Sequence, residues 1–239
     1  MREVVTGVHL LRGFPPAAIN VYLLRGEGQM ILVDTATRHA GRRILRQLDA
    51  GPDAIFITHA HRDHAGAMHE VAEATGAPVW ASEGDAGAVE GREPQPMPAK
   101  HQDHIVNRMF RGWWRDHHPV SRRLQEGDRV AGFEVISFTG HTPGQVGLWR
   151  ESDRTVLCAD TMRSVNLFTG MPQLGEMPVI FTCDVSEARQ SIRKLAALEA
   201  NTVCFGHGRP LTKNAASKIN DFAAALPPDG NSGSAEGSR

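Results

Sequence analysis

The chain has 239 residues, 41% of them hydrophobic and 22% charged, which is enough to bury a full core in an ordinary globular protein. Its 26 basic and 27 acidic residues give a formal net charge of −1, and such balance provides no overall attraction to nucleic acid or to an anionic membrane. Three widely spaced cysteines and an N-terminus without a long apolar run argue against a disulfide framework and a secretory signal. We therefore expect a cytoplasmic monomer or homodimer with a small-molecule substrate and neither nucleic-acid nor membrane partners.

The first third of the chain predicts alternating strands and helices. Its strands are short β-branched and apolar runs bounded by turn residues, and its helices place apolar residues three and four apart. In chain order the predicted elements are strands at 19–24 and 30–33, a helix at 38–48, a strand at 54–58, a helix from Met68 and a strand at 78–82.

The segment 91–123 differs from the rest in its Pro, Arg, His and Trp content, and we interpret it as an insertion that is helical near 103–115. One interpretation makes its tryptophans packing anchors, whereas the other makes the segment a lid with an apolar wall and cations for an anionic group. The candidate substrate contacts are Trp113, Trp114, Arg111, Arg115 and Arg108, together with His117 and His118, which are otherwise surface residues.

The remaining elements are strands at 129–138, 145–150 and 155–159, a helix at 185–198, a strand at 202–205 and a helix at 214–225. The polar residues 226–239 predict a disordered tail, so that 1–225 forms one domain. Two similar halves of strands with interspersed helices suit helices that cover a pair of packed sheets.

Metal-ligand chemistry is concentrated in one run, His59-Ala60-His61-Arg62-Asp63-His64. Four potential ligands lie within six residues, directly after the predicted strand 54–58. A turn that follows a rigid strand lets short imidazoles and carboxylates converge on one point, as a metal site requires.

Three further candidates share this placement. His141 lies in a Gly/Pro turn after an apolar run, Asp160 follows the strand 155–159, and His207 follows the strand 202–205. Loops that follow strands gather at a sheet edge, where functional sites are usually built. Five imidazoles and two carboxylates without thiolates suit zinc, and also iron or manganese.

With Asp34 added, these motifs in this order resemble the metallo-β-lactamase superfamily, and the resemblance covers residues 1 to about 212. It implies an α+β fold, a four-layer αββα sandwich with the site at the sheet edge. It also implies a first metal held by His59, His61 and His141, and a second held by Asp63, His64 and His207. Asp160 would bridge the two metals, and Asp34 would orient a ligand, although a purely structural acid in a turn is the alternative.

Two zinc ions about 3.5 Å apart could share a hydroxide that is nucleophilic at neutral pH, and Asp63 would orient it. Asp160 makes the pattern more similar to the glyoxalase II, lactonase and general metallohydrolase branches than to true β-lactamases. Glyoxalase II has a C-terminal helical domain, whereas only 32 residues follow His207 here. The leading hypothesis is hydrolysis of a small ester, thioester or lactone.

Several alternatives stay open. A mononuclear-iron persulfide dioxygenase of the same fold would use the equivalents of His59, His141 and Asp160. A β-lactamase, a phosphodiesterase and a non-catalytic metal-binding module are the others. For Tyr22 and Cys158 we favour a place in the core over a catalytic role.

Overall fold

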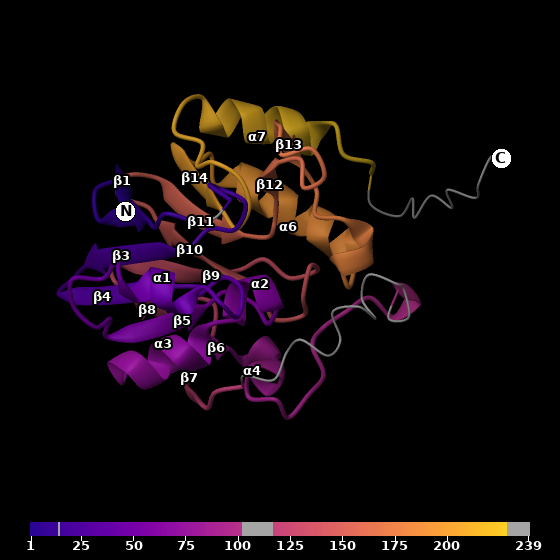
Figure 1. Cartoon of the computed structure of the whole chain (residues 1–239). Helices are drawn as coiled ribbons and strands as arrows, with labels where there is room; N and C mark the ends of the chain where they lie inside the picture. The colour runs from indigo at the N-terminus through magenta and orange to yellow at the C-terminus, as the bar shows by residue number, and fades with distance from the viewer. Residues whose placement is uncertain (14, 102–116, 229–239) are drawn as a thin grey trace.

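The computed structural model describes residues 1–13, 15–101 and 117–228, and it consists of two β-sheets packed face to face with helices on their outer faces (Figure 1). The predicted αββα sandwich is therefore confirmed. Among the helices of these ranges, none is both long and apolar enough to span a bilayer.

The first sheet contains seven strands in chain order. They are β1 (Arg2–Val5), β2 (Val8–Leu10), β3 (Tyr22–Gly26), β4 (Gln29–Val33), β5 (Ala54–Ile57), β6 (Val79–Ser82) and β7 (Val120–Leu124). The strands β1 to β4 pair antiparallel, whereas β4 to β7 pair parallel. Parallel pairing requires crossover connections, and helices α1 and α3 lie in two of them.

The second sheet has five strands in the order β14-β11-β10-β9-β8. They are β8 (Arg129–Val130), β9 (Phe133–Ser137), β10 (Val146–Arg150), β11 (Thr155–Ala159) and β14 (Thr202–Phe205), of which β11 and β14 pair parallel. A separate hairpin of β12 (Arg163–Val165) and β13 (Pro172–Gly175) follows β11.

Helices complete the outer layers. On the side of the first sheet they are α1 (Gly41–Leu45), α2 (Arg62–Ala65), α3 (Met68–Thr75) and α4 (Glu83–Val89), and α6 (Val185–Ala197) and α7 (Ala215–Ala224) cover the second sheet (Figure 1). Two 3₁₀ turns, η1 (Ala99–His101) and η2 (Val179–Phe181), lie in the connections.

Alternation along the strands divides the apolar residues among three cores. On β4, Leu32 packs beneath α1 and α3, whereas Ile31 and Val33 face the second sheet. Successive side chains of a strand point to opposite faces, so a continuous apolar run serves two layers at once. The third core lies between the second sheet and α6 and α7. Tyr22 and Cys158 are both buried in these cores, as predicted.

The structure differs from the sequence predictions in several places. The helix predicted at 38–48 is limited to α1, and the strand predicted at 129–138 is divided by a turn in which Ala131 and Gly132 both have positive φ. Residues 120–123 belong to β7, so the segment 91–123 is not wholly an insertion. The strands β1, β2, β12 and β13 and the helices α2 and α4 were not predicted, because each is too short to give a clear apolar period.

Two predictions fall partly or wholly outside the described residues. The helix predicted near 103–115 lies in the undescribed range 102–116. The first residues of the tail predicted from 226 are described: Leu226 packs against the third core, and the Pro227 carbonyl accepts a hydrogen bond from Arg193. The rest of that tail, from 229, is outside the description.

Candidate metal centre

Seven predicted ligands meet at one edge of the two packed sheets, beyond the ends of their strands, and both sheets contribute to the group. His59, His61, Asp63 and His64 follow β5, whereas His141 follows β9, Asp160 follows β11 and His207 follows β14. His61 precedes α2, and Asp63 and His64 lie within it. The two halves of the chain therefore build one site.

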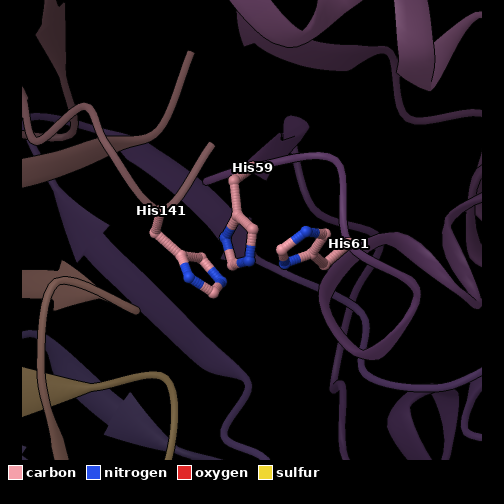
Figure 2. A group of neighbouring side chains, drawn as sticks. All are labelled: His59, His61 and His141. Carbon is pink, nitrogen blue, oxygen red and sulfur yellow. The ribbon is translucent and has the colours of Figure 1, made fainter. Parts of the chain in front are cut away.

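The side chains form overlapping groups. His59, His61 and His141 present one ligand atom each within 4.8 Å of one another, and so do Asp63, His64 and His207. Figure 2 shows the rings of His59, His61 and His141 converging on a common space. A further group, His59, His64 and Asp160, links the two.

Asp160 lies at the centre of the cluster. Its Oδ2 is 3.2 Å from His207 Nε2 and 3.5 Å from His141 Nε2, and its Oδ1 is 3.3 Å from His64 Nε2. Its side chain is only 2% exposed. A buried carboxylate that reaches imidazoles from both groups has the position that a ligand shared by two metal ions would occupy.

The outer ring nitrogen of every histidine in the cluster has a partner. The list of pairs is His59 with Thr58, His61 with the Pro96 carbonyl, His64 with Asp34, His141 with Thr182 and His207 with the Ala18 carbonyl. The hydroxyls of Thr58 and Thr182 donate elsewhere, to Asp34 and to the Pro178 carbonyl, so each accepts from its imidazole. An outer nitrogen that donates leaves the inner nitrogen with a free lone pair, which is how imidazoles are oriented toward metals.

The inner atoms, in contrast, are buried and lack hydrogen bonds. They are the Nε2 atoms of His59, His64, His141 and His207 and Oδ1 of Asp160. Leaving several buried polar atoms unpaired is costly, and a positive ion at their common centre would satisfy them together. The residues present therefore fit a dinuclear metal site.

The first group is electrically neutral. Burial, together with the nearby imidazoles of His64 and His61, holds the pKa of His59 well below its usual range. Burial also lowers the pKa of His61, and it lowers the pKa of His141 to about 3. These three imidazoles are unprotonated at neutral pH and need lose no proton before they bind a metal.

The second group is charged. Burial alone would lower the pKa of His207, but Asp160 and Asp63 raise it to about 10. In the same way, Asp160 and Asp34 overcome burial and raise the pKa of His64 well above its usual range. Without a metal this half stores protons between carboxylates, and a bound cation would replace them.

Comparison with known proteins agrees with this geometry. The sequence profile of the Metallo-beta-lactamase superfamily matches residues 14–207, which include every residue of the cluster. The chain belongs to this superfamily. Together with the buried His and Asp groups, membership makes it a metal-dependent hydrolase.

Three relatives show the range of the similarity. The "Probable metallo-hydrolase YflN" of Bacillus subtilis is 28% identical over 94% of this chain and 92% of its own length. The hydroxyacylglutathione hydrolase of Methylobacillus flagellatus is 29% identical over 78% of this chain, but over only 61% of its own length. The crystal structure of TTHA1623 in a di-iron-bound form is 27% identical, with a TM-score of 0.63 over 87% of this chain and 96% of that one.

Asp34 supports the metal centre through the outer nitrogen of His64. It is 3% exposed, accepts from the Nδ1–H of His64 at 2.7 Å, and accepts from the Thr58 backbone N–H and hydroxyl, each at 2.8 Å. Because Thr58 in turn contacts His59, this carboxylate helps to fix a ring in each half of the cluster.

Asp85 is a supporting residue that sequence reasoning missed. It is 1% exposed and accepts from the Ala60 N–H, the Thr142 hydroxyl and the Gly144 N–H. It therefore connects the loop after β5 with the loop that carries His141. Its position just after β6, shared with the ligands after other strands, was the one signal available.

Gly206 explains how tightly the last ligand loop packs. A Cβ at this position would lie 2.0 Å from Oδ1 of Asp160 and 2.7 Å from the ring of His64. Only glycine lets the chain carry His207 this close to both halves of the centre.

The predicted substrate contacts are not part of the cluster. Arg108, Arg111, Trp113, Trp114 and Arg115 lie outside the described residues. His117 lies over Gly91, where a Cβ would meet its ring. His118 lies beside His69 and Glu73 of α3, and not among the ligands of the metal centre.

Proposed function

We propose that this superfamily member hydrolyses a small ester, thioester or lactone with two zinc ions. His59, His61 and His141 would hold one ion, and Asp63, His64 and His207 the other, with Asp160 between them. When bound, the pair of ions supplies a water that is nucleophilic at neutral pH and polarises the scissile bond.

One observation supports the proposal above all others. Four of the five imidazoles have an inner Nε2 that is buried without a hydrogen bond, as is Oδ1 of Asp160, while the outer nitrogens of all five imidazoles are bonded. A solely structural histidine cluster would pair its inner atoms with protein groups as well. Donors arranged this way are prepared for ions and not for one another.

Asp63 is the ligand candidate best placed to act on water. Its side chain is 37% exposed, whereas those of His207 and Asp160 are 6% and 2% exposed. Burial would raise its pKa, but His207, whose Nε2 lies 3.2 Å from Oδ2 of Asp63, outweighs burial and keeps the carboxyl ionised far below neutral pH. An ionised carboxylate accepts hydrogen bonds only, so Asp63 would orient the O–H of a water toward itself.

One relative supports the substrate class. It is a hydroxyacylglutathione hydrolase, whose name denotes cleavage of a thioester. This chain spans about three fifths of that relative's length, so the proposal does not extend to glutathione itself. A simpler ester, thioester or lactone would undergo the same hydrolysis and would not require recognition of glutathione.

Metal content and hydrolysis measured on one preparation test the proposal. Purified protein should contain two equivalents of zinc and hydrolyse at least one substrate in a panel of esters, thioesters and lactones. Asp160→Ala should lose metal and lose activity by roughly 10³-fold, because it removes the ligand common to both groups. The exposed Asp49→Ala is the matched control and should keep both.

Two results would contradict the proposal in different ways. Protein that binds no transition metal, or an Asp160→Ala variant with undiminished hydrolysis, would remove the metal mechanism. A single iron per chain with oxygen uptake on glutathione persulfide would replace hydrolysis with dioxygenase chemistry. Two equivalents of iron with intact hydrolysis would keep the reaction and change only the metal.

A further inference from the structure

A small pocket opens directly beside the metal centre. His141, Asp160 and Thr161 form one wall of it, and the other wall comes from residues 176–192, which include η2 and the first half of α6. The pocket therefore begins at the reacting centre and extends under α6, away from the loop after β5.

The second wall is mostly apolar. Met177, Val185, Ala188 and Ile192 line it, together with Val179, which is 53% exposed. Ile192 is 1% exposed and belongs to the third core, so this part of the lining is closely packed.

The polar side chains of the second wall are already engaged. Glu176 accepts from Arg189, with Nε to Oε1 at 2.7 Å, and Thr182 pairs with His141 and with the Pro178 carbonyl. No Arg or Lys is among the described residues that line the space. An anionic group would therefore be desolvated here without a partner, which is unfavourable, whereas an alkyl group would not.

The pocket is also small, with a volume of about 30 Å³. A cavity of this size holds roughly two water molecules, and so roughly two carbon atoms of a chain. The leaving group of a thioester is usually far larger. The part of a substrate that fits is the short alkyl group attached to the scissile carbonyl.

From these observations we infer that the pocket is an acyl site that selects substrates with short, unbranched apolar acyl groups of about two carbons beyond the carbonyl. The inference rests on the proposed function, and it specifies the acyl side of the substrate's scissile bond. Hydrolysis breaks the acyl–oxygen or acyl–sulfur bond, water supplies the hydroxyl of the acid, and its remaining proton goes to the alcohol or thiol. Ala188 lines the pocket from α6, so a larger side chain at this position would fill part of it.

A series of p-nitrophenyl esters with one leaving group and acyl chains from acetyl to octanoyl tests the inference on the metal-loaded protein. The kcat/KM of the wild type should be highest for propionyl and fall at least tenfold by hexanoyl. Ala188→Leu fills the pocket and should lower kcat/KM for propionyl about tenfold with little change for acetyl. Val185→Ala enlarges it and should move the optimum to a longer acyl chain.

The matched control is Ala197→Leu, the same substitution at an exposed position of α6, which should leave the profile unchanged. Thermal unfolding of each variant verifies that it folds. A chain-length profile that Ala188→Leu does not alter would overturn the acyl site while the hydrolase survives.

Binding of propionate and hexanoate, measured by isothermal titration, separates the two ideas further. Protein that hydrolyses nothing, yet binds propionate more tightly than hexanoate in an Ala188-dependent way, would keep the pocket and overturn the proposed function. Protein that hydrolyses nothing and shows no such preference would overturn both.

Discussion

Among the described residues, four sets of side chains bring three metal-ligand atoms within 4.8 Å of one another; three of them overlap in the metal centre, and the fourth lies at the surface. Only the centre is built as a site. In the metal centre, His59 and His64 are fully buried. In the surface trio of His69, Glu73 and His118, the side chains of Glu73 and His118 are 68% and 18% exposed. Water can satisfy the surface trio, whereas it does not reach the inner nitrogens of the centre. Proximity of donors is therefore a weaker sign of a metal site than burial without partners.

The outer contacts of the two groups differ as well. His64 is held by Asp34, which is itself buried and bonded to Thr58. In the surface trio, Nδ1 of His118 contacts the carbonyl of the adjacent Pro119, and its Nε2 is 4.0 Å from Glu73. A ligand is oriented by its neighbours. The comparison predicts large effects for changes in the centre and small ones in the surface trio.

The largest effect is expected when an imidazole is removed from the metal centre. The same change in the surface trio should have almost no effect. His59→Ala should lower kcat/KM roughly 10³-fold and reduce the metal bound per chain, because metal catalysis supplies several kcal/mol. His69→Ala should leave both within twofold of wild type. Metal analysis and steady-state kinetics on the same preparations measure this. Equal losses in the two variants would abolish the distinction between the groups.

Removing the metal should destabilise the protein by about 4 kcal/mol when the metal had been present at roughly a thousand times its dissociation constant. The inner nitrogens then have no ion to satisfy them. Chemical denaturation with and without a chelator measures the free energy of unfolding. The His69→Ala protein should lose the same amount, since the ions concerned are in the centre. A chelator that has no effect on wild type would show that the centre is stable without metal.

The unfolding free energy of the metal-free protein should be largest near pH 6.5, the ordinary pKa of histidine. At pH 6.5 it should exceed its value at pH 5 by roughly 2 kcal/mol. The pKa of His141 is lowered to about 3, so its contribution is present above pH 6.5 and is lost as the pH falls. The pKa of His207 is raised to about 10, so its contribution is present below pH 6.5 and is lost as the pH rises. Denaturation at several pH values measures the curve. An unfolding free energy that declines neither below nor above pH 6.5 would refute the charge difference between the two halves of the centre.

Much of this centre could be predicted from the sequence because its ligands come shortly after predicted strands in the chain. The strands at 155–159 and 202–205 were predicted with the bounds that the structure gives, and a residue just beyond each lies in the cluster. Asp85 was missed because its role consists of contacts to Thr142 and Gly144, 57 and 59 residues away. The pocket beside Asp160 was missed for the same reason, since η2 and α6 meet the second sheet only in the folded chain.

Asp34→Asn tests the outer contacts without touching an inner nitrogen. An amide of the same shape keeps one acceptor but loses the charge that orients His64 through a 2.7 Å hydrogen bond. Metal affinity should fall about 10- to 100-fold, the usual effect of removing such a partner. Competition with a chelating dye measures the affinity, and Asp221→Asn on the exposed side of α7 is the control. A variant with wild-type affinity would assign Asp34 a role in the turn after β4 alone.

The smallest effect is expected for Glu73→Gln in the surface trio. Its carboxylate is 68% exposed and 4.0 Å from His118, and exposed pairs of this kind contribute about 0 to 1 kcal/mol. The unfolding free energy should change by less than about 0.5 kcal/mol, and the metal content of the loaded protein should remain that of wild type. Denaturation in high salt provides a second measure, because screening should remove even this difference. A loss of one metal equivalent in Glu73→Gln would show that exposed donors in this protein also hold an ion, and that burial is not the property that separates the two groups.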